Sequence, residues 1–187
     1  MRTFVAIELG EACRAALADA ADRLRSTVGG VRWVRVESLH LTLKFVGELA
    51  ESDLPAAAQV LDDAAAAVQP FTMQVCGLSG FPPRGVPRVI HVGAEEPTGA
   101  LSELQRRVEE GLERGLGIAR EKRRYVPHLT LGRVKDRRRC PSMQEIAALV
   151  PDQEFGRVEV DCIVLMKSDL RPSGAVYTPL QRFPLVR

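Results

Sequence analysis

The feature that most constrains this chain is a tetrapeptide that occurs twice. The copies His40-Leu41-Thr42-Leu43 and His128-Leu129-Thr130-Leu131 contain two of the three histidines among the 187 residues. Each copy lies in a β-prone segment, and successive side chains of a strand point to opposite faces. His and Thr therefore share one face, and the two leucines share the other. Such a strand packs on a core with one face and presents an imidazole and a hydroxyl with the other.

The bulk composition is that of an ordinary globular protein. Apolar residues make up 45% of the chain, and the length allows one domain or two small lobes. The net charge of +2 is too small to imply a nucleic-acid coat or a membrane surface. No apolar run is long enough for a transmembrane helix, and residues 1–8 form a short strand-like segment rather than a signal peptide. We expect a cytoplasmic protein that does not associate with a membrane.

The cysteines point to a reduced protein. Cys13, Cys76, Cys140 and Cys162 form no C-x-x-C pair, so their spacing suggests neither a zinc site nor a redox motif.

Basic residues cluster on both sides of the second tetrapeptide. Those before it are Arg120, Lys122, Arg123 and Arg124, and those after it are Lys135, Arg137, Arg138 and Arg139. These clusters are either solvated loops or a surface that attracts a polyanion near the site.

The pattern of apolar residues and of breakers predicts an α+β fold. Strands are expected at residues 3–9, 31–36, 39–46, 71–78, 88–92, 128–134, 155–167 and 175–184, helices at 10–28, 52–68, 98–116 and 142–149, a loop at 79–87 and a turn at 170–174.

This order is a strand–helix–strand–strand–helix series that appears roughly twice. The offset between the tetrapeptides, from residue 40 to residue 128, is 88 residues and close to half the chain, which is typical of a duplicated lobe. Strands that follow one another without a helix indicate antiparallel sheets. We expect two similar lobes of antiparallel sheet flanked by helices around a central cleft, related by a pseudo-two-fold axis and packed as one bilobal domain over residues 1–187.

Two imidazoles and two hydroxyls in one cleft suit acid–base chemistry on a phosphodiester. An unperturbed histidine pKa of about 6.5 lets one ring be neutral and the other cationic near pH 7. Thr42 and Thr130 can donate hydrogen bonds to the non-bridging oxygens, where charge builds up. No metal or other cofactor is expected, because no carboxylate–histidine cluster is present and the carboxylate nearest to His40 in sequence is Glu37. A single His-x-Thr is more often structural, and the residues alone do not say which histidine is the acid.

Three cationic residues are further candidates for substrate binding. Arg88 can form a forked contact with phosphate, or it is an ordinary surface residue. Lys44 lies four residues after His40, which places it on the same face of a regular strand, at the mouth of the cleft. Arg133 lies five residues after His128 and faces away from that imidazole in a regular strand.

The remaining candidate site residues are three aromatic residues and the third histidine. Tyr125, Trp33 and Phe45 can stack on bases, although such residues more often belong to a core. His91 lacks a Thr partner, so we expect a structural or cleft-lining role for it.

The paired motif and its setting resemble the two-histidine (2H) phosphoesterase family. More narrowly, the chain is similar to the bacterial RNA 2′,3′-cyclic phosphodiesterases, also called 2′-5′ RNA ligases. The matching stretches are residues 2–7, 40–48, 80–82, 87–90 and 127–133, with Ser168-Asp169-Leu170 and Tyr177 near the C-terminus. His91 departs from the aromatic residue that members of the family often carry after the Pro-Arg strand.

This resemblance implies hydrolysis of a terminal 2′,3′-cyclic phosphate on RNA to a 2′-phosphomonoester. It assigns His40 as proton donor to the leaving 3′ oxygen and His128 as proton acceptor from water. The substrate would be an RNA or oligonucleotide with a 2′,3′-cyclic phosphate end, and nothing in the sequence demands a protein partner or an oligomer. The alternatives are a phosphodiesterase or ligase that acts on other cyclic or 2′-5′-linked nucleotides, and a non-catalytic module that binds RNA ends.

Overall fold

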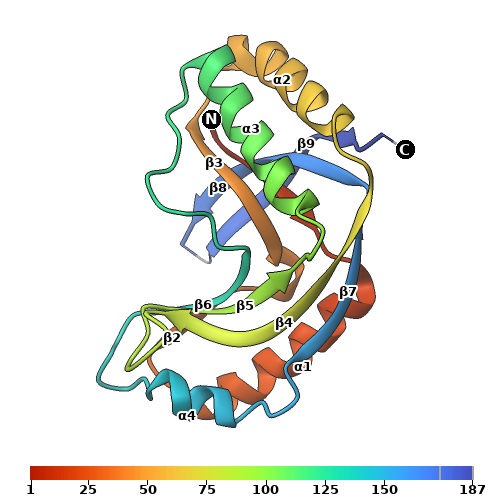
Figure 1. The fold of residues 1–187 in the computed structure, drawn as a ribbon. Helices are drawn as coiled ribbons and strands as arrows, with labels where there is room; N and C mark the ends of the chain where they lie inside the picture. Colours follow the sequence, from red (N-terminus) through yellow and green to blue (C-terminus); the bar gives the residue numbers. More distant parts are fainter. Residues whose placement is uncertain (173, 187) are drawn as a thin grey trace.

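Two curled antiparallel sheets form the centre of the molecule (Figure 1). The computed structural model describes residues 1–172 and 174–186. The four-stranded sheet has the order β3-β1-β8-β9, with β1 at Arg2–Glu8, β3 at His40–Glu48, β8 at Cys162–Arg171 and β9 at Gly174–Pro184. The five-stranded sheet has the order β2-β6-β5-β4-β7, with β2 at Val31–Trp33, β4 at Phe71–Phe81, β5 at Val89–Glu95, β6 at His128–Val134 and β7 at Glu154–Val160. This architecture confirms the predicted α+β class with antiparallel sheets.

Two of the helices contact the sheet that does not contain the strand before them. The main helices are α1 at Glu11–Thr27, α2 at Leu54–Ala66, α3 at Ala100–Leu116 and α4 at Met143–Ala148, and two short 3-10 turns, η1 at Val36–Ser38 and η2 at Glu51–Asp53, lie beside the first motif strand. Helix α1 follows β1 of the four-stranded sheet but packs against β7 of the five-stranded one. Helix α3 follows β5 of the five-stranded sheet but packs against β3 and α2 (Figure 1). The two lobes are therefore interlocked, and neither is a continuous half of the chain.

Several predicted boundaries are wrong. The long strand expected at residues 155–167 is two strands, because the chain leaves the five-stranded sheet at Asp161 and enters the other sheet as β8. The loop expected at 79–87 begins later, because residues 79–81 continue β4 and pair with β5. Gly80 allows this continuation, since a Cβ there would lie 2.8 Å from Met143 Sδ. Within the turn expected at 170–174, residues 170 and 171 still belong to β8, and Ser173 lies outside the described residues.

Both motif strands contain a one-residue insertion at the second leucine of the tetrapeptide. In β3, Thr42 pairs with Ala6 and Lys44 with Val5, so Leu43 has no partner. In β6, Thr130 pairs with His91 and Gly132 with Ile90, so Leu131 has no partner. Such a bulge reverses the facing of the side chains that follow relative to a regular strand, and in β3 a second insertion at Val46 ends this effect after Phe45.

The bulge in β3 sends Lys44 into the interior. Only 1% of its side chain is exposed, and its Nζ lies 2.9 Å from Glu109 Oε1 of α3. The ammonium also donates to the carbonyl of Ala119 at 2.7 Å, and the backbone N–H of Glu121 donates to Glu109 at 2.9 Å. The prediction that Lys44 lies on the face of His40 is therefore wrong. Lys44 instead fastens the segment after α3 to the first motif strand.

No helix in the described ranges is both long and apolar enough to cross a membrane.

Replacement of Lys44 by Met should lower the free energy of unfolding by about 3–5 kcal/mol, because the Glu109 carboxylate would lose its buried counter-ion. Urea unfolding measures this change. The matched control is Arg25→Ala, which removes an exposed ion pair with Asp22 and should cost less than about 1 kcal/mol. Equal effects of the two substitutions would contradict the structural role of Lys44.

Candidate functional site

The first motif histidine lies on the face of the four-stranded sheet that points away from the main core. A small separate cluster of Phe4, Ala6, Val164 and Met166, with Tyr177 packed on it, covers this face. The His40 ring stacks on Phe4 at 4.7 Å between centroids and meets the edge of Tyr177 at 5.0 Å. Its Nδ1 lies 2.8 Å from the carbonyl oxygen of Ser38.

The second motif histidine has an equivalent setting in the five-stranded sheet. His128 Nδ1 lies 2.7 Å from the carbonyl oxygen of Val126, again two residues upstream. The ring meets Phe81 edge-on at 5.0 Å and His91 at 5.2 Å.

These two hydrogen bonds select the tautomer of both rings. A carbonyl oxygen only accepts, so each Nδ1 carries the proton and donates it. Each Nε2 is therefore the nitrogen left for chemistry, as an acceptor in the neutral ring and as a donor in the cationic ring. The arrangement presents two equivalent proton carriers, and it does not by itself make either one the acid.

The two motif strands come together where the sheets meet. Strands β3 and β6 are in contact, and Tyr125, just before β6, donates from its hydroxyl to the carbonyl of Thr42 at 3.0 Å. Burial lowers the pKa of His40 more than its bond to Ser38 raises it, and the charge of Arg14 lowers it further. Thr42 and Thr130 are half-buried and share the faces of their histidines.

Tyr125 has a structural role and does not have the role in base stacking that the sequence suggested. Its hydroxyl is committed to Thr42 and its ring packs against the main core. Trp33 is also on the core side, because it pairs with Gly132 of β6. A Cβ on Gly132 would lie 3.0 Å from the indole, so the glycine makes this packing possible. Phe45 is 55% exposed and faces the same side as Phe4 and His40.

Arg133 lies on the side of His128, contrary to the expectation for a regular strand. The bulge at Leu131 turns Gly132 toward the core, so Arg133 pairs with Val89 on the face that carries His91 and Thr130. The guanidinium is exposed. Arg133 therefore holds the same position in the second motif strand that Phe45 holds in the first, five residues after the histidine. A sequence pattern with regular alternation assigns both of these residues to the wrong face.

The surroundings of His91 were the hardest to predict from the sequence. His91 is 5% exposed, its ring lies 4.2 Å from that of Phe81 at a tilt of 31°, and within the described residues neither of its ring nitrogens has a hydrogen-bond partner. Burial lowers its pKa to about 4, and the charge of His128 contributes to the shift. His91 is therefore a neutral ring that packs against the second catalytic candidate.

Arg88 lies just before β5, beside a hollow of about 520 Å³. The hollow shares Phe81 with the contacts of His128. Its lining residues are Phe81, Pro82, Arg88, Val89, Arg123 and Arg137.

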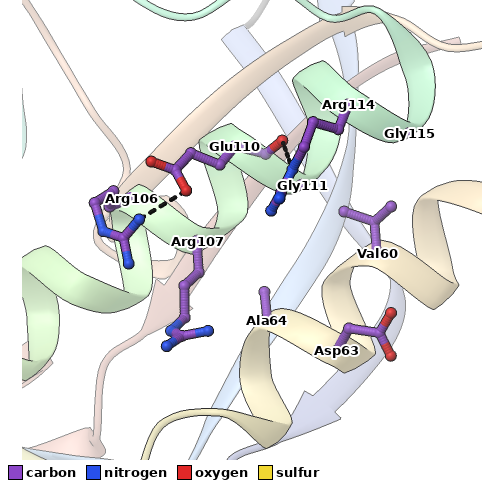
Figure 2. A pocket seen from close by; sticks show the side chains of 9 residues that line it. All are labelled: Val60, Asp63, Ala64, Arg106, Arg107, Glu110, Gly111, Arg114 and Gly115. Carbon is purple, nitrogen blue, oxygen red and sulfur yellow. Dashed lines mark hydrogen bonds and ion pairs between the residues drawn. The ribbon is translucent and has the colours of Figure 1, made fainter.

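A second hollow, of about 370 Å³, lies between α2 and α3 (Figure 2). Gly111 and Gly115 of α3 face Val60 of α2 there, and a Cβ on Gly111 would lie 2.7 Å from Val60. Three arginines line it, Arg106, Arg107 and Arg114, and Arg106 is paired with Glu110 at 2.7 Å. None of the motif residues lines this hollow, so it is not part of the histidine site.

Among the described residues, no group of three or more His, Cys, Asp or Glu side chains is arranged to hold a metal ion.

The fold and the paired histidine motifs define a known class of protein. Residues 13–172 match the family model of the 2'-5' RNA ligase superfamily, and the chain belongs to this family.

Relatives with curated names match over nearly the whole chain. A Methanothermobacter thermautotrophicus protein named RNA 2',3'-cyclic phosphodiesterase is 35% identical over 99% of both chains. An Archaeoglobus fulgidus protein of the same name is 37% identical over 98% of this chain and 99% of its own. Among solved structures, a Thermus thermophilus protein superposes with a TM-score of 0.83 at 34% identity, over 99% of this chain and 98% of that one. E. coli LigT in complex with 3'-AMP, at 24% identity and a TM-score of 0.79 over 100% and 98% of the two chains, shares the fold.

The buried neutral state of His91 should make the protein sensitive to acid. The unfolded chain binds a proton near pH 6.5, but the folded chain does so only near pH 4, so stability is lost as the pH falls through that window. At pH 5 the loss amounts to about 2 kcal/mol relative to neutral pH. His91→Phe keeps an aromatic ring and removes the titrating group, so its loss of stability between pH 7 and pH 5 should be smaller by about that amount. Urea unfolding at both pH values measures the difference, and equal losses in the two proteins would contradict it.

Proposed function

We propose that this protein is an RNA 2′,3′-cyclic phosphodiesterase that opens the terminal cyclic phosphate to a 2′-phosphomonoester. One observation carries the proposal: two motif histidines on adjoining sheets each commit Nδ1 to a carbonyl and leave Nε2 for proton transfer. The names of the full-length relatives support the choice of substrate.

The reaction needs one proton acceptor and one proton donor. His128 Nε2 takes a proton from water as the water oxygen attacks phosphorus. The bond from phosphorus to the 3′ oxygen breaks, and the protonated His40 gives its Nε2 proton to that oxygen. The phosphate remains on the 2′ oxygen, and the two rings return to their starting states by exchange of a proton with solvent. The direction of transfer follows the family resemblance, because the two settings are alike in their hydrogen bonds.

Neighbouring groups stabilise the charge that develops on the non-bridging oxygens. Thr42 and Thr130 share the faces of the two histidines and donate from their hydroxyls. Arg133 lies on the face of His128 and supplies a guanidinium, which fits phosphate oxygens. The chemistry rests on these protein groups and requires no metal ion.

His40→Ala and His128→Ala should each reduce turnover of a 2′,3′-cyclic nucleotide by about 10²–10⁴-fold, because each removes one proton carrier. The assay contains EDTA, and the product is identified as the 2′- or 3′-phosphate. We expect the wild type to be active with the chelator and to release only the 2′-phosphate.

Urea unfolding of the two variants is the control, and their midpoints should stay close to that of the wild type because both rings lie outside the main core. Near-wild-type turnover by either variant would exclude the mechanism. A 3′-phosphate product would reverse the assignment of the leaving oxygen. Retained binding without turnover in the wild type would favour a module that only binds RNA ends.

Substrate binding should shift the alkaline limb of the pH–rate profile upward. The rate falls at high pH when His40 loses its proton, and burial lowers the pKa of His40 in the free protein. A bound phosphodiester anion favours the cationic ring and raises that pKa. The limb should therefore lie at higher pH in kcat, which reports the complex, than in kcat/KM, which reports the free enzyme. Steady-state rates between pH 5 and pH 9 test this, and coincident limbs would contradict it.

A further inference from the structure

The hollow beside His128 gathers arginines that are far apart in the sequence. Arg88 precedes β5, Arg123 lies between α3 and β6, and Arg137 follows β6. The remaining lining residues, Phe81, Pro82 and Val89, are apolar, so the hollow is lined by guanidinium groups and apolar side chains with no carboxylate among them.

The charges of these arginines are available to a ligand. Throughout residues 1–172 and 174–186, none of the three forms an ion pair with a protein carboxylate. Arg137 gives one N–H to the carbonyl of Val86 at 3.1 Å, which positions its guanidinium and leaves the other donors. Arg106 and Arg120 differ, since both are paired with glutamates of α3. The hollow is thus a local excess of positive charge that the protein itself does not neutralise.

The hollow also lies beside the second motif histidine. Phe81 is one of its lining residues, and the Phe81 ring meets the ring of His128 edge-on at 5.0 Å. Val89, another lining residue, pairs with Arg133 across β5 and β6. The hollow therefore lies next to the surroundings of His128.

We propose that this hollow binds the phosphodiester that precedes the terminal nucleotide of an RNA chain. The inference rests on the proposed function and adds a second phosphate site to it. A 2′,3′-cyclic phosphate occupies the 3′ end of its chain, so the next phosphate lies on the 5′ side of the terminal nucleoside. Guanidinium groups suit that anion, and the apolar lining suits the adjoining sugar and base. The site makes the enzyme prefer an oligoribonucleotide over a cyclic mononucleotide.

The test compares two substrates in two double variants. The substrates are adenosine 2′,3′-cyclic phosphate and an adenosine trinucleotide that ends in a 2′,3′-cyclic phosphate. The variant R123Q/R137Q removes two charges of the hollow. The control R124Q/R138Q removes two charges from the same basic runs, at exposed positions that do not line the hollow.

The wild type should have a lower KM for the trinucleotide than for the mononucleotide. R123Q/R137Q should raise the KM for the trinucleotide by about tenfold or more and leave kcat/KM for the mononucleotide within about twofold. R124Q/R138Q should leave both within about twofold. Equal loss on both substrates, equal loss in the control variant, or no preference of the wild type for the trinucleotide would each overturn the second phosphate site.

A binding measurement separates this inference from the proposed function. A fluorescent adenosine trinucleotide with a terminal 2′-phosphate is titrated at several salt concentrations, without any need for turnover. Loss of one phosphate contact in R123Q/R137Q should reduce the slope of log K against log salt by about 0.7. An unchanged slope and affinity would overturn the second phosphate site. Absence of turnover on both cyclic substrates, with the slope reduced as expected, would overturn only the proposed activity.

Discussion

The site depends on a departure from regular strand geometry that both motif strands share. An extra residue at Leu43 and at Leu131 reverses the facing of the side chains that follow. In β3 the reversal buries Lys44 against Glu109 and exposes Phe45. In β6 it turns Gly132 toward Trp33 and brings Arg133 to the face of His128. The same local irregularity thus adds a residue to the core on one side of each strand and a residue to the histidine face on the other.

The interlocked arrangement of the lobes explains how the motifs keep their relative position. Helix α1 packs against β7 of the sheet that does not contain the preceding strand, and α3 contacts both sheets, through β3 and β4. The hydrogen bonds from Tyr125 to the carbonyl of Thr42 and from Lys44 to the carbonyl of Ala119 then tie the segment before β6 to β3, and the ion pair between Lys44 and Glu109 ties α3 to the same strand. These contacts are buried or partly buried, so the two imidazoles are held by the core rather than by a mobile connection.

The two histidines share a hydrogen-bond pattern but differ in their surroundings. His40 is stacked on Phe4 and lies at the edge of Tyr177, whereas His128 adjoins His91 and a hollow rich in arginine. A neutral His91 leaves the region around His128 without a further positive charge from that ring. The guanidinium groups therefore supply the positive charge on this side of the site.

The sequence by itself determined the class of fold, the paired histidines and threonines, and the chemistry they suit. Strand alternation places His40 beside Thr42 and His128 beside Thr130, and the offset of 88 residues indicates one shared site. Only the tertiary structure decided the places of Lys44, Arg133, Tyr125 and His91. A bulge is set by pairing with a neighbouring strand, and the break at Asp161 follows from the passage between two sheets. The burial of His91 and the convergence of Arg88, Arg123 and Arg137 likewise depend on contacts between segments far apart in the chain. Local periodicity in the sequence does not predict such contacts.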